Sequence, residues 1–431
     1  MEISENTGNG FSTHCRRGEN PNTALKMKPM RIKDKMQIAV RLIARRCLKL
    51  FWVFPINKKK ILFESYDGEA YSCSPKYLSE YLEKKRPGEY EQVWAFNHPE
   101  RFSALPEEHR LRIVGKRTIR WYYDYLTACV RITNVTTQLS YIPKRKKQMV
   151  LNTWHAGGAY KRTGIISEYV QGKNEFEKWR RRSQAGNIDL FLSSSPVFTE
   201  TNIRAGYRYT GRVLPSGLPR NDLFFDSDRV FRCAEKQRKA LGISGFVVLY
   251  APTYRGNMDH TDEVPPFPFA AVAAAVHERY GLAPTVLVRA HYFDKHVLQT
   301  ADSDPNAPLR ILDVSQVPDM QELLCAADLL ITDYSSCIWD YALLGRPCLL
   351  YVPDLERYAS SDRGFFTPID EWPGLICRDE SALCASIRPL DEEACRRRAK
   401  QHLRKFQSYE QGRACEMTLQ AIEDFIKTGE R

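Results

Sequence analysis

The stretch that decides the fold is residues 328–358, DLLITDYSSCIWDYALLGRPCLLYVPDLERY. Its first part, 328–332, is a short apolar run typical of a buried parallel strand. Apolar residues then recur at helical spacing over 338–344, and the Gly-Arg-Pro sequence at 345–347 ends that helix. Residues 348–352 form a second apolar run. The stretch therefore predicts one βαβ unit of a parallel sheet.

The turn between this strand and its helix has the sequence Asp333-Tyr334-Ser335-Ser336. Helix N-termini bind phosphate because several N–H groups lack partners there and the helix dipole favours an anion. A serine in this position more often simply caps the helix, and the turn alone favours that interpretation. The two roles are compatible, because one serine can cap while its neighbour and the backbone bind phosphate.

Composition limits the possible classes of protein. A chain of 431 residues is long enough for two domains, and a net charge of +12 indicates an anionic partner such as nucleic acid, anionic lipid or a phosphorylated small molecule. The twelve cysteines include no C-x-x-C pair, which argues against a zinc site or a disulfide scaffold and predicts reduced thiols in the cytoplasm. No apolar run reaches the roughly 18 residues of a membrane span, and no secretory signal is evident.

The N-terminal part of the chain has two predicted segments. Residues 1–25 are polar and are expected to be disordered. Within 26–56, apolar residues recur at helical spacing among lysines and arginines, and the segment ends in aromatic residues. This pattern favours a basic amphipathic helix that contacts an anionic membrane surface. The alternative is a helix docked on the protein with its basic face in water.

The rest of the chain alternates strand-like runs with helix-length segments, the rhythm of doubly wound parallel sheets. The runs lie at 61–65, 92–96, 129–133, 149–153 and 188–193, and after a linker at 214–232 they resume at 246–250, 285–289, 309–312 and 328–332. We therefore expect an α/β protein with two Rossmann-like domains, 57–225 and 226–431, the second ending in a charged helical region over 391–427. Ligands in such sheets bind outside the carboxyl ends of the strands, so the predicted site is the cleft between the domains.

Two histidines follow predicted strands directly. His155 comes after the run at 149–153, and Gly157 and Gly158 behind it would let a substrate approach the backbone closely. Histidine is the side chain best able to take a proton near neutral pH. A loop histidine with glycine turn residues is the alternative, but His291 occupies the same kind of position after 285–289.

Anion-binding side chains also gather at strand ends. Thr253 and Arg255 follow the run at 246–250, and Ser194 and Arg220 add a hydroxyl and a second guanidinium, a group that binds anions bidentately. Two Asp-Ser-Asp triplets, at 226–228 and 302–304, lie in polar stretches and are interpreted as solvated loops, not as metal sites. The set indicates chemistry on a polyanion with a proton acceptor at hand.

Several motifs together resemble the CDP-glycerol glycerophosphotransferase family, the teichoic-acid primases and polymerases. The resemblance runs in order from about residue 50 to about residue 425. Its motifs are FPINKKKILFES (54–65), NTWHAGGAYKRTG (152–164), SSS (193–195), GLPRND (217–222), YAPTYR (250–255), RAHY (289–292), the stretch 328–358 and RGFF (363–366).

The resemblance implies a GT-B arrangement in which an N-terminal acceptor domain is followed by a C-terminal domain that binds the CDP-polyol donor. It implies transfer of a polyol phosphate, most often glycerol phosphate, to a hydroxyl of a lipid-linked polyprenyl saccharide or polyol phosphate, with release of CMP. No cofactor is expected, and the chemistry makes physical sense without a metal because N–H groups, arginine and an imidazolium can stabilise the charge on the non-bridging oxygens. The product would be a teichoic-acid-like or capsular polymer, made by a peripheral protein at the cytoplasmic face of the membrane. Nucleic acid is not an expected partner.

The resemblance also assigns roles to residues. His155 would be the general base on the acceptor hydroxyl, and His291 would lie against the donor pyrophosphate or the attacked phosphorus. The residues expected on the donor side are Ser194, Arg220, Thr253, Arg255, Asp333, Ser335 and Ser336, and those on the acceptor side are Gly157, Gly158 and Lys161. The commoner family form after the first histidine is Gly-Thr-Pro-x-Lys, whereas this chain has Ala-Gly-Gly-Ala-Tyr-Lys. Glycerol and ribitol phosphate therefore both remain open.

Two other functions stay in view. A GT-B glycosyltransferase that uses a nucleotide sugar predicts an acidic ribose-binding motif in the second domain, and none stands out. A non-enzymatic basic protein that binds membrane or nucleic acid gives no reason for histidines at strand ends.

Overall fold

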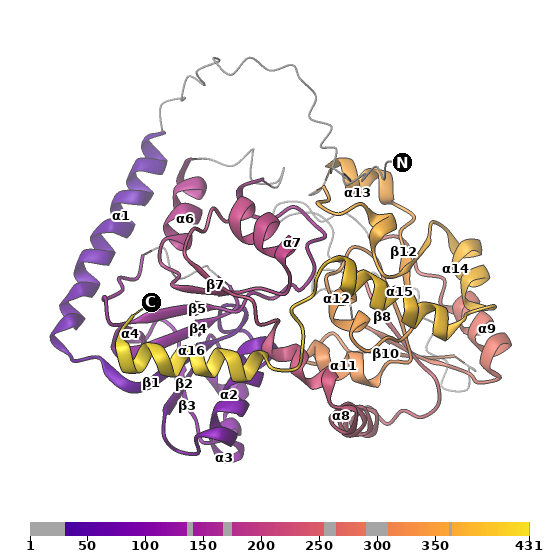
Figure 1. Cartoon of the computed structure of the whole chain (residues 1–431), viewed down its shortest axis with the longest axis horizontal. Helices are drawn as coiled ribbons and strands as arrows, with labels where there is room; N and C mark the ends of the chain where they lie inside the picture. Colours follow the sequence, from indigo (N-terminus) through magenta and orange to yellow (C-terminus); the bar gives the residue numbers. More distant parts are fainter. Residues whose placement is uncertain are drawn as a thin grey trace, which may run out of the picture.

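The computed structural model describes residues 31–135, 141–166, 175–253, 264–289, 309–361 and 364–430. Within them the chain forms two parallel sheets with helices on their faces, placed side by side (Figure 1). The predicted pair of doubly wound α/β domains is thereby confirmed. The strand order is β3-β2-β1-β4-β5-β6-β7 in the first sheet and β10-β9-β8-β11-β12-β13 in the second.

The strands are short, and the central ones are buried along their whole length, as expected of sheets covered on both faces. The first sheet contains β1 (Asn57–Glu64), β2 (Glu91–Phe96), β3 (Arg112–Gly115), β4 (Ala128–Thr133), β5 (Met149–Asn152), β6 (Leu190–Leu192) and β7 (Arg212–Leu214). The second contains β8 (Val247–Ala251), β9 (Thr285–Val288), β10 (Arg310–Asp313), β11 (Leu329–Thr332), β12 (Cys348–Tyr351) and β13 (Leu375–Cys377).

The helices connect and cover these strands. In the first half they are α1 (Ile32–Leu48), α2 (Cys73–Lys85), α3 (Leu105–Glu108), α4 (Ile119–Thr127), α6 (Glu175–Ala185), α7 (Pro196–Phe198) and the π-helix Thr199–Gly206. A 3-10 helix, Pro219–Phe225, then leads into α8 (Ser227–Ala240), α9 (Phe269–Tyr280), α11 (Met320–Ala326), α12 (Cys337–Ala342), α13 (Leu355–Ser361), α14 (Glu380–Ile387), α15 (Glu392–Lys405) and α16 (Ala414–Thr428). Asp226 caps α8 by accepting a hydrogen bond from the Arg229 N–H at 3.0 Å.

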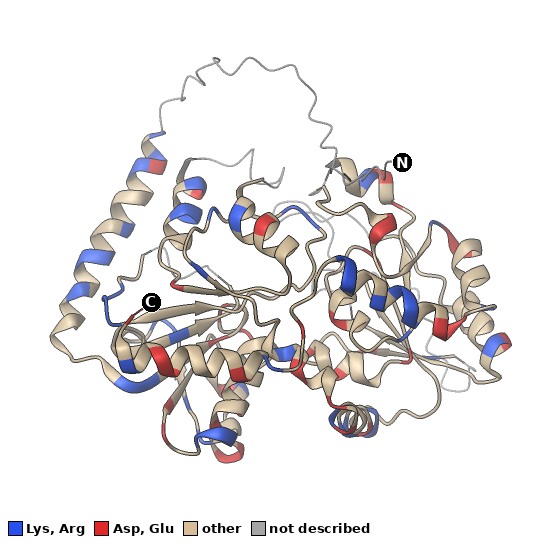
Figure 2. Ribbon diagram, viewed as in Figure 1, with Lys and Arg blue, Asp and Glu red and all other residues tan. Residues whose placement is uncertain are grey.

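Helix α1 lies at the edge of the first domain, beside α6 (Figure 1). Its apolar side chains point to solvent: Ile32 is 77% exposed, Met36 63% and Val40 64%. Figure 2 shows lysines and arginines along the same helix. Among the residues placed by the structure, none of the helices is both long and apolar enough to cross a bilayer.

The last helix, α16, returns to the first domain, where it lies beside α2 (Figure 1). Glu423 of α16 accepts a hydrogen bond from Arg86 Nε at 2.8 Å, and Leu419, Ile422 and Phe425 are buried. The sequence predicts that all residues from 226 to 431 belong to the second domain. In the structure the apolar face of α16 is buried beside α2, so this helix packs on the first domain. The helical region expected over 391–427 is correspondingly two helices, α15 and α16, separated by an irregular crossing segment.

The crossing segment is held by a buried carboxylate. Glu410 accepts hydrogen bonds from the Leu218 N–H at 3.0 Å, from Asn221 Nδ2 at 3.0 Å and from Trp339 Nε1 at 3.2 Å. Burial raises the pKa of Glu410 to about 8. Gly217 has φ +76°, and a Cβ there would lie 2.4 Å from the Glu410 carboxylate, so this crossing requires glycine.

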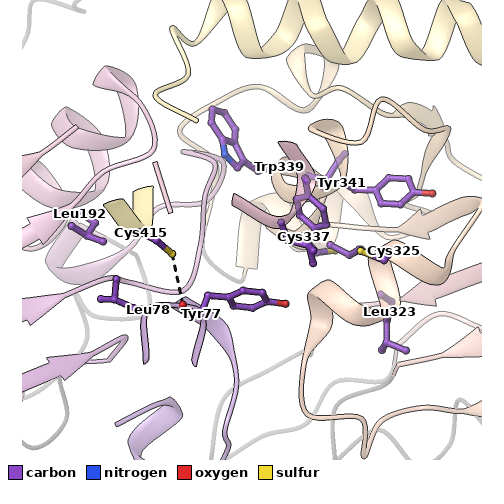
Figure 3. Close-up of a cluster of buried hydrophobic side chains, with 14 of the residues drawn as sticks. Tyr77, Leu78, Leu192, Leu323, Cys325, Cys337, Trp339, Tyr341 and Cys415 are labelled. Carbon is purple, nitrogen blue, oxygen red and sulfur yellow. Dashed lines mark hydrogen bonds between the residues drawn. The ribbon is translucent and has the colours of Figure 1, made fainter. Parts of the chain in front are cut away.

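The two domains share one hydrophobic core. Leu78 and Leu192 from the first half belong to the same buried cluster as Leu323 and Trp339 from the second (Figure 3). Lys76 adds an interdomain ion pair with Asp319 at 2.8 Å. A shared apolar core of this kind fixes the relative position of two domains better than a polar contact does.

Candidate active site

A cavity of about 490 Å³ lies between the two sheets. It is lined by residues that follow β1, β5, β8, β9 and β11, so it sits at the carboxyl ends of strands from both domains. Two larger hollows, of about 770 and 650 Å³, are lined by residues of the second half alone and do not adjoin those strand ends. Because ligands of parallel α/β sheets bind at the carboxyl ends of strands, the interdomain cavity is the candidate site.

His155 enters this cavity from the end of β5. Trp154 before it has φ +53°, a strained value for a bulky residue, and its N–H donates to Asn152 Oδ1 at 2.8 Å. The His155 Nδ1 atom lies 2.9 Å from the carbonyl oxygen of Asn134. Because a carbonyl only accepts, Nδ1 carries the proton, and Nε2 is the nitrogen that can take one from a substrate.

Asn134, which the sequence patterns did not single out, organises this side of the cavity. It is fully buried at the end of β4. Its Oδ1 accepts a hydrogen bond from the Tyr66 N–H at 2.7 Å, and its Nδ2 donates to Ser65 Oγ at 3.2 Å. One residue thus joins the ends of β1 and β5 and fixes the tautomer of His155. The sequence could have pointed to Asn134, because it is a polar residue directly after the buried strand β4.

Tyr66 was also missed. Its φ is +46°, and its ring centroid lies 5.9 Å from that of His155. Asp67 beside it has φ +59° and pairs with Lys116 at 2.6 Å. The turn places an aromatic ring next to the candidate base. Its backbone geometry depends on contacts with β3 and β4, so local sequence does not reveal it.

The turn Ser335-Ser336 lines the cavity from the second domain. Ser335 Oγ accepts a hydrogen bond from the Cys337 N–H at 3.4 Å, whereas Ser336 holds the N-cap position of α12 and makes no side-chain cap bond. Asp333 lies behind the turn, where its carboxylate accepts the Thr253 N–H at 2.8 Å. Thr253 lines the cavity, whereas Asp333 is not among the lining residues and holds the backbone of Thr253 in place.

Arg220 borders the cavity but its guanidinium is already engaged. Its Nε and Nη2 donate to Asp340 at 2.9 and 3.2 Å, and both side chains are buried. Asp340 also accepts hydrogen bonds from Asn221 Nδ2 at 2.9 Å and Gln321 Nε2 at 3.0 Å. Arg220, which the sequence predicts as a donor ligand, lines the cavity and also ties the interdomain linker to α12.

The glycine loop after His155 is packed tightly. Ser194, which is fully buried, donates its hydroxyl to the Gly157 carbonyl and does not line the cavity. A Cβ on Gly157 would lie 2.1 Å from Trp339 Cδ1, so only glycine fits. Gly158 and Lys161 line the cavity.

Arg289 is a further basic residue of the cavity that the patterns treated as part of a strand. It follows β9, and its Nη1 donates to the Val317 carbonyl at 2.5 Å. Burial lowers the pKa of its guanidinium from the usual value. Arg255 and His291, both predicted at this site, lie outside the described residues.

Comparisons with known proteins agree with this geometry. The family model described as CDP-glycerol:poly(glycerophosphate) glycerophosphotransferase matches residues 47–424. The chain is 30% identical over 369 residues to the teichoic acid poly(glycerol phosphate) polymerase of Bacillus subtilis strain 168, covering 84% of this chain and 48% of that protein. It is 28% identical to the teichoic acid glycerol-phosphate transferase of Staphylococcus aureus strain NCTC 8325, covering 85% of this chain and 93% of that one. The chain thus spans about half the length of the first relative and nearly all of the second.

Solved structures agree in fold. A structure of the wall teichoic acid polymerase TagF soaked with CDPG superposes with a TM-score of 0.75 at 25% identity, over 92% of this chain and 97% of that one. A putative UDP-N-acetylglucosamine 2-epimerase from Listeria monocytogenes, at 15% identity and a TM-score of 0.51, shares the fold alone. The family match covers most of the chain and confirms the resemblance predicted from its motifs. The chain belongs to the CDP-glycerol:poly(glycerophosphate) glycerophosphotransferase family.

Proposed function

We propose that the protein transfers glycerol phosphate from CDP-glycerol to a hydroxyl of a lipid-linked acceptor in teichoic-acid-like or capsular polymer synthesis. The observation that carries this proposal is the tautomer of His155. Its Nδ1–H is held by the Asn134 carbonyl at 2.9 Å, in a cavity lined on the other domain by the Ser335-Ser336 turn. Family membership and the likeness to teichoic acid transferases support the choice of donor.

The reaction follows from these positions. His155 Nε2 takes the proton of the acceptor hydroxyl as its oxygen attacks the phosphorus that bears glycerol. A new P–O bond forms, the P–O bond to the cytidylyl phosphate breaks, and CMP leaves with the bridging oxygen. Ser335, Ser336 and Arg289 line the same cavity, and we propose that they stabilise the charge on the non-bridging oxygens. His291 is proposed to act on the same phosphates.

The donor is tested directly by incubating the purified protein and a lipid-linked acceptor with CDP-glycerol, CDP-ribitol or a UDP-sugar in separate reactions. We expect release of CMP from CDP-glycerol, with the acceptor gaining one or more glycerol phosphate units by mass spectrometry. A competition between equal amounts of CDP-glycerol and CDP-ribitol reports the preferred polyol. Transfer from the UDP-sugar, with no CMP released from either CDP-polyol, would exclude the proposed activity.

We also propose that α1 binds the surface of an anionic membrane, which would bring the cavity to a lipid-linked acceptor. Apolar side chains of soluble proteins normally pack inward, whereas Ile32, Met36 and Val40 point away from the protein. Arg31, Lys33 and Lys35 add positive charge to the same end of the helix and are exposed. Exposed apolar residues flanked by cations are the pattern of a helix that lies in the membrane interface.

Replacing Ile32, Met36 and Val40 together with aspartate is expected to lower the fraction of protein bound to vesicles containing phosphatidylglycerol by more than tenfold. Burying each such side chain is worth roughly 1.5–3 kcal/mol, and all three contributions would be lost. CMP release with a water-soluble acceptor analogue should not change. The control is Phe231→Asp, because Phe231 is 66% exposed but lies on α8. Equal vesicle binding by the triple variant and this control would refute the role of α1.

A further inference from the structure

The loop that carries His155 does not stay within its own domain. Beyond the glycines it pairs with residues 364–367 of the second domain, and Lys161 forms an antiparallel bridge with Phe365. The Phe366 N–H donates to the Tyr160 carbonyl at 2.9 Å, and Thr367 Oγ1 donates to the Ala159 carbonyl at 2.8 Å. The loop therefore begins at the end of β5 in the first domain and ends hydrogen-bonded to the backbone of the second domain.

Tyr160 anchors the far end of this loop. Its side chain is 1% exposed, with its ring centroid 4.4 Å from that of Trp372 and 6.5 Å from that of Trp339. Its hydroxyl lies 2.8 Å from His402 Nε2, on α15. A buried hydroxyl in an aromatic pocket needs such a partner, because an unmet polar group there costs free energy.

The hydrogen-bond directions at His402 are fixed by its second contact. Its Nδ1 lies 2.9 Å from the carbonyl oxygen of Glu371, so Nδ1 carries the proton and Nε2 accepts from the Tyr160 hydroxyl. Burial lowers the pKa of His402 to about 4, so the ring is neutral at physiological pH. The contact is a neutral, fully satisfied interdomain hydrogen bond.

The same loop touches the helix behind the serine turn. Gly157 packs directly on the ring of Trp339, which belongs to α12, and α12 begins immediately after Ser335-Ser336. Trp339 also contacts the ring of His402, with centroids 5.9 Å apart. The loop that carries His155 thus packs against the ring of Trp339, a residue of the helix that follows the serine turn.

We infer that Tyr160, held by His402, is a positioning residue that fixes the His155 loop to the domain carrying Ser335 and Ser336. The hydrogen bond sets the distance between proton acceptor and donor phosphate, although neither Tyr160 nor His402 takes part in the chemistry. This inference rests on the proposed function.

The first test compares Tyr160→Phe with Tyr209→Phe. Tyr209 is also buried, at 3% exposed, and donates one hydrogen bond to the Arg212 carbonyl at 3.0 Å, but this bond stays within the first domain. Both variants should lose similar thermal stability. We expect only Tyr160→Phe to lower kcat, by about 10- to 100-fold with KM for CDP-glycerol within about twofold, because misplacing a reacting group by 1 Å has effects of that size. Equal kcat in the two variants would overturn the inference.

The second test uses His402. His402→Gln retains a carbonyl oxygen that can accept the Tyr160 hydroxyl and should keep most of kcat, whereas His402→Leu should match Tyr160→Phe. The double variant Tyr160→Phe/His402→Leu should be no slower than His402→Leu alone. Equal kcat in His402→Gln and His402→Leu would contradict the positioning role.

Amide hydrogen exchange gives a readout that does not depend on the reaction. Tyr160→Phe should speed exchange in residues 156–162 and 364–367 and leave residues 190–195 unchanged. If wild-type protein releases no CMP from CDP-glycerol, the proposed function fails, while this exchange result still decides whether Tyr160 fixes the loop to the second domain. Unaltered exchange in both segments would remove the structural basis of the inference.

Discussion

His155→Asn is expected to lower kcat for CMP release about 10³-fold, the contribution typical of a positioned general base. Asparagine is the informative substitution because its Nδ2 can still donate to the Asn134 carbonyl, as His155 Nδ1 does at 2.9 Å. The variant can keep that contact and loses the rest of the imidazole ring, including the nitrogen that accepts the proton. Donor KM and thermal stability should therefore stay close to those of the wild type.

The pH dependence of kcat/KM distinguishes a role of His155 as general base from a purely steric role in the site. In the wild type kcat/KM should rise with pH as an imidazole loses its proton, and that limb should be absent in His155→Asn. The control is His98→Asn. His98 is exposed, and its side chain pairs with that of Glu100, outside the cavity. A His155→Asn enzyme with more than a tenth of wild-type kcat would exclude His155 as the base.

Asp340→Ala is expected to have the largest effect on stability, about 3–5 kcal/mol, the cost typical of removing one partner of a buried ion pair. Arg220 loses its bidentate acceptor, and Asn221 and Gln321 each lose an acceptor among the same buried side chains. Denaturant unfolding followed by tryptophan fluorescence measures this change. Activity should fall as well, since Asp340 holds α12 and its serine turn.

Two further variants test the cause of that loss. Arg220→Met/Asp340→Leu removes both charges together and should recover much of the stability lost in Asp340→Ala, because no unpaired charge remains. Glu278→Ala breaks the exposed pair with Arg388 and should leave the unfolding midpoint unchanged. A loss in the double variant as large as that in Asp340→Ala would show that packing, and not the unpaired guanidinium, is responsible.

The sequence predicted the central strands but not three at the edges. The strands β3, β7 and β13 were missed, and each is the outermost of its sheet. A central parallel strand is buried on both faces and reads as a continuous apolar run, as in β8 and β11. An edge strand has weaker constraints, and β7, Arg212–Leu214, is partly exposed. The predicted linker at 214–232 accordingly contains the last residue of β7, a 3-10 helix and the start of α8.

The candidate site was predictable only in part, for a related reason. A polar residue at a strand end was visible in the sequence, but the direction of its side chain was not. His155 and Ser336 line the cavity, whereas Ser194 and Asp333 turn to neighbouring backbone groups. Asn134 acts through contacts with segments far away in sequence, which no local pattern records.

The return of α16 to the first domain has a consequence for biosynthesis. Leu419, Ile422 and Phe425 cover part of the first domain, yet a ribosome makes them only after the whole second sheet. At about 5–20 residues per second, the more than 180 residues between Arg220 and α16 take at least several seconds to translate. During that interval the nascent first domain exposes the apolar surface of α2.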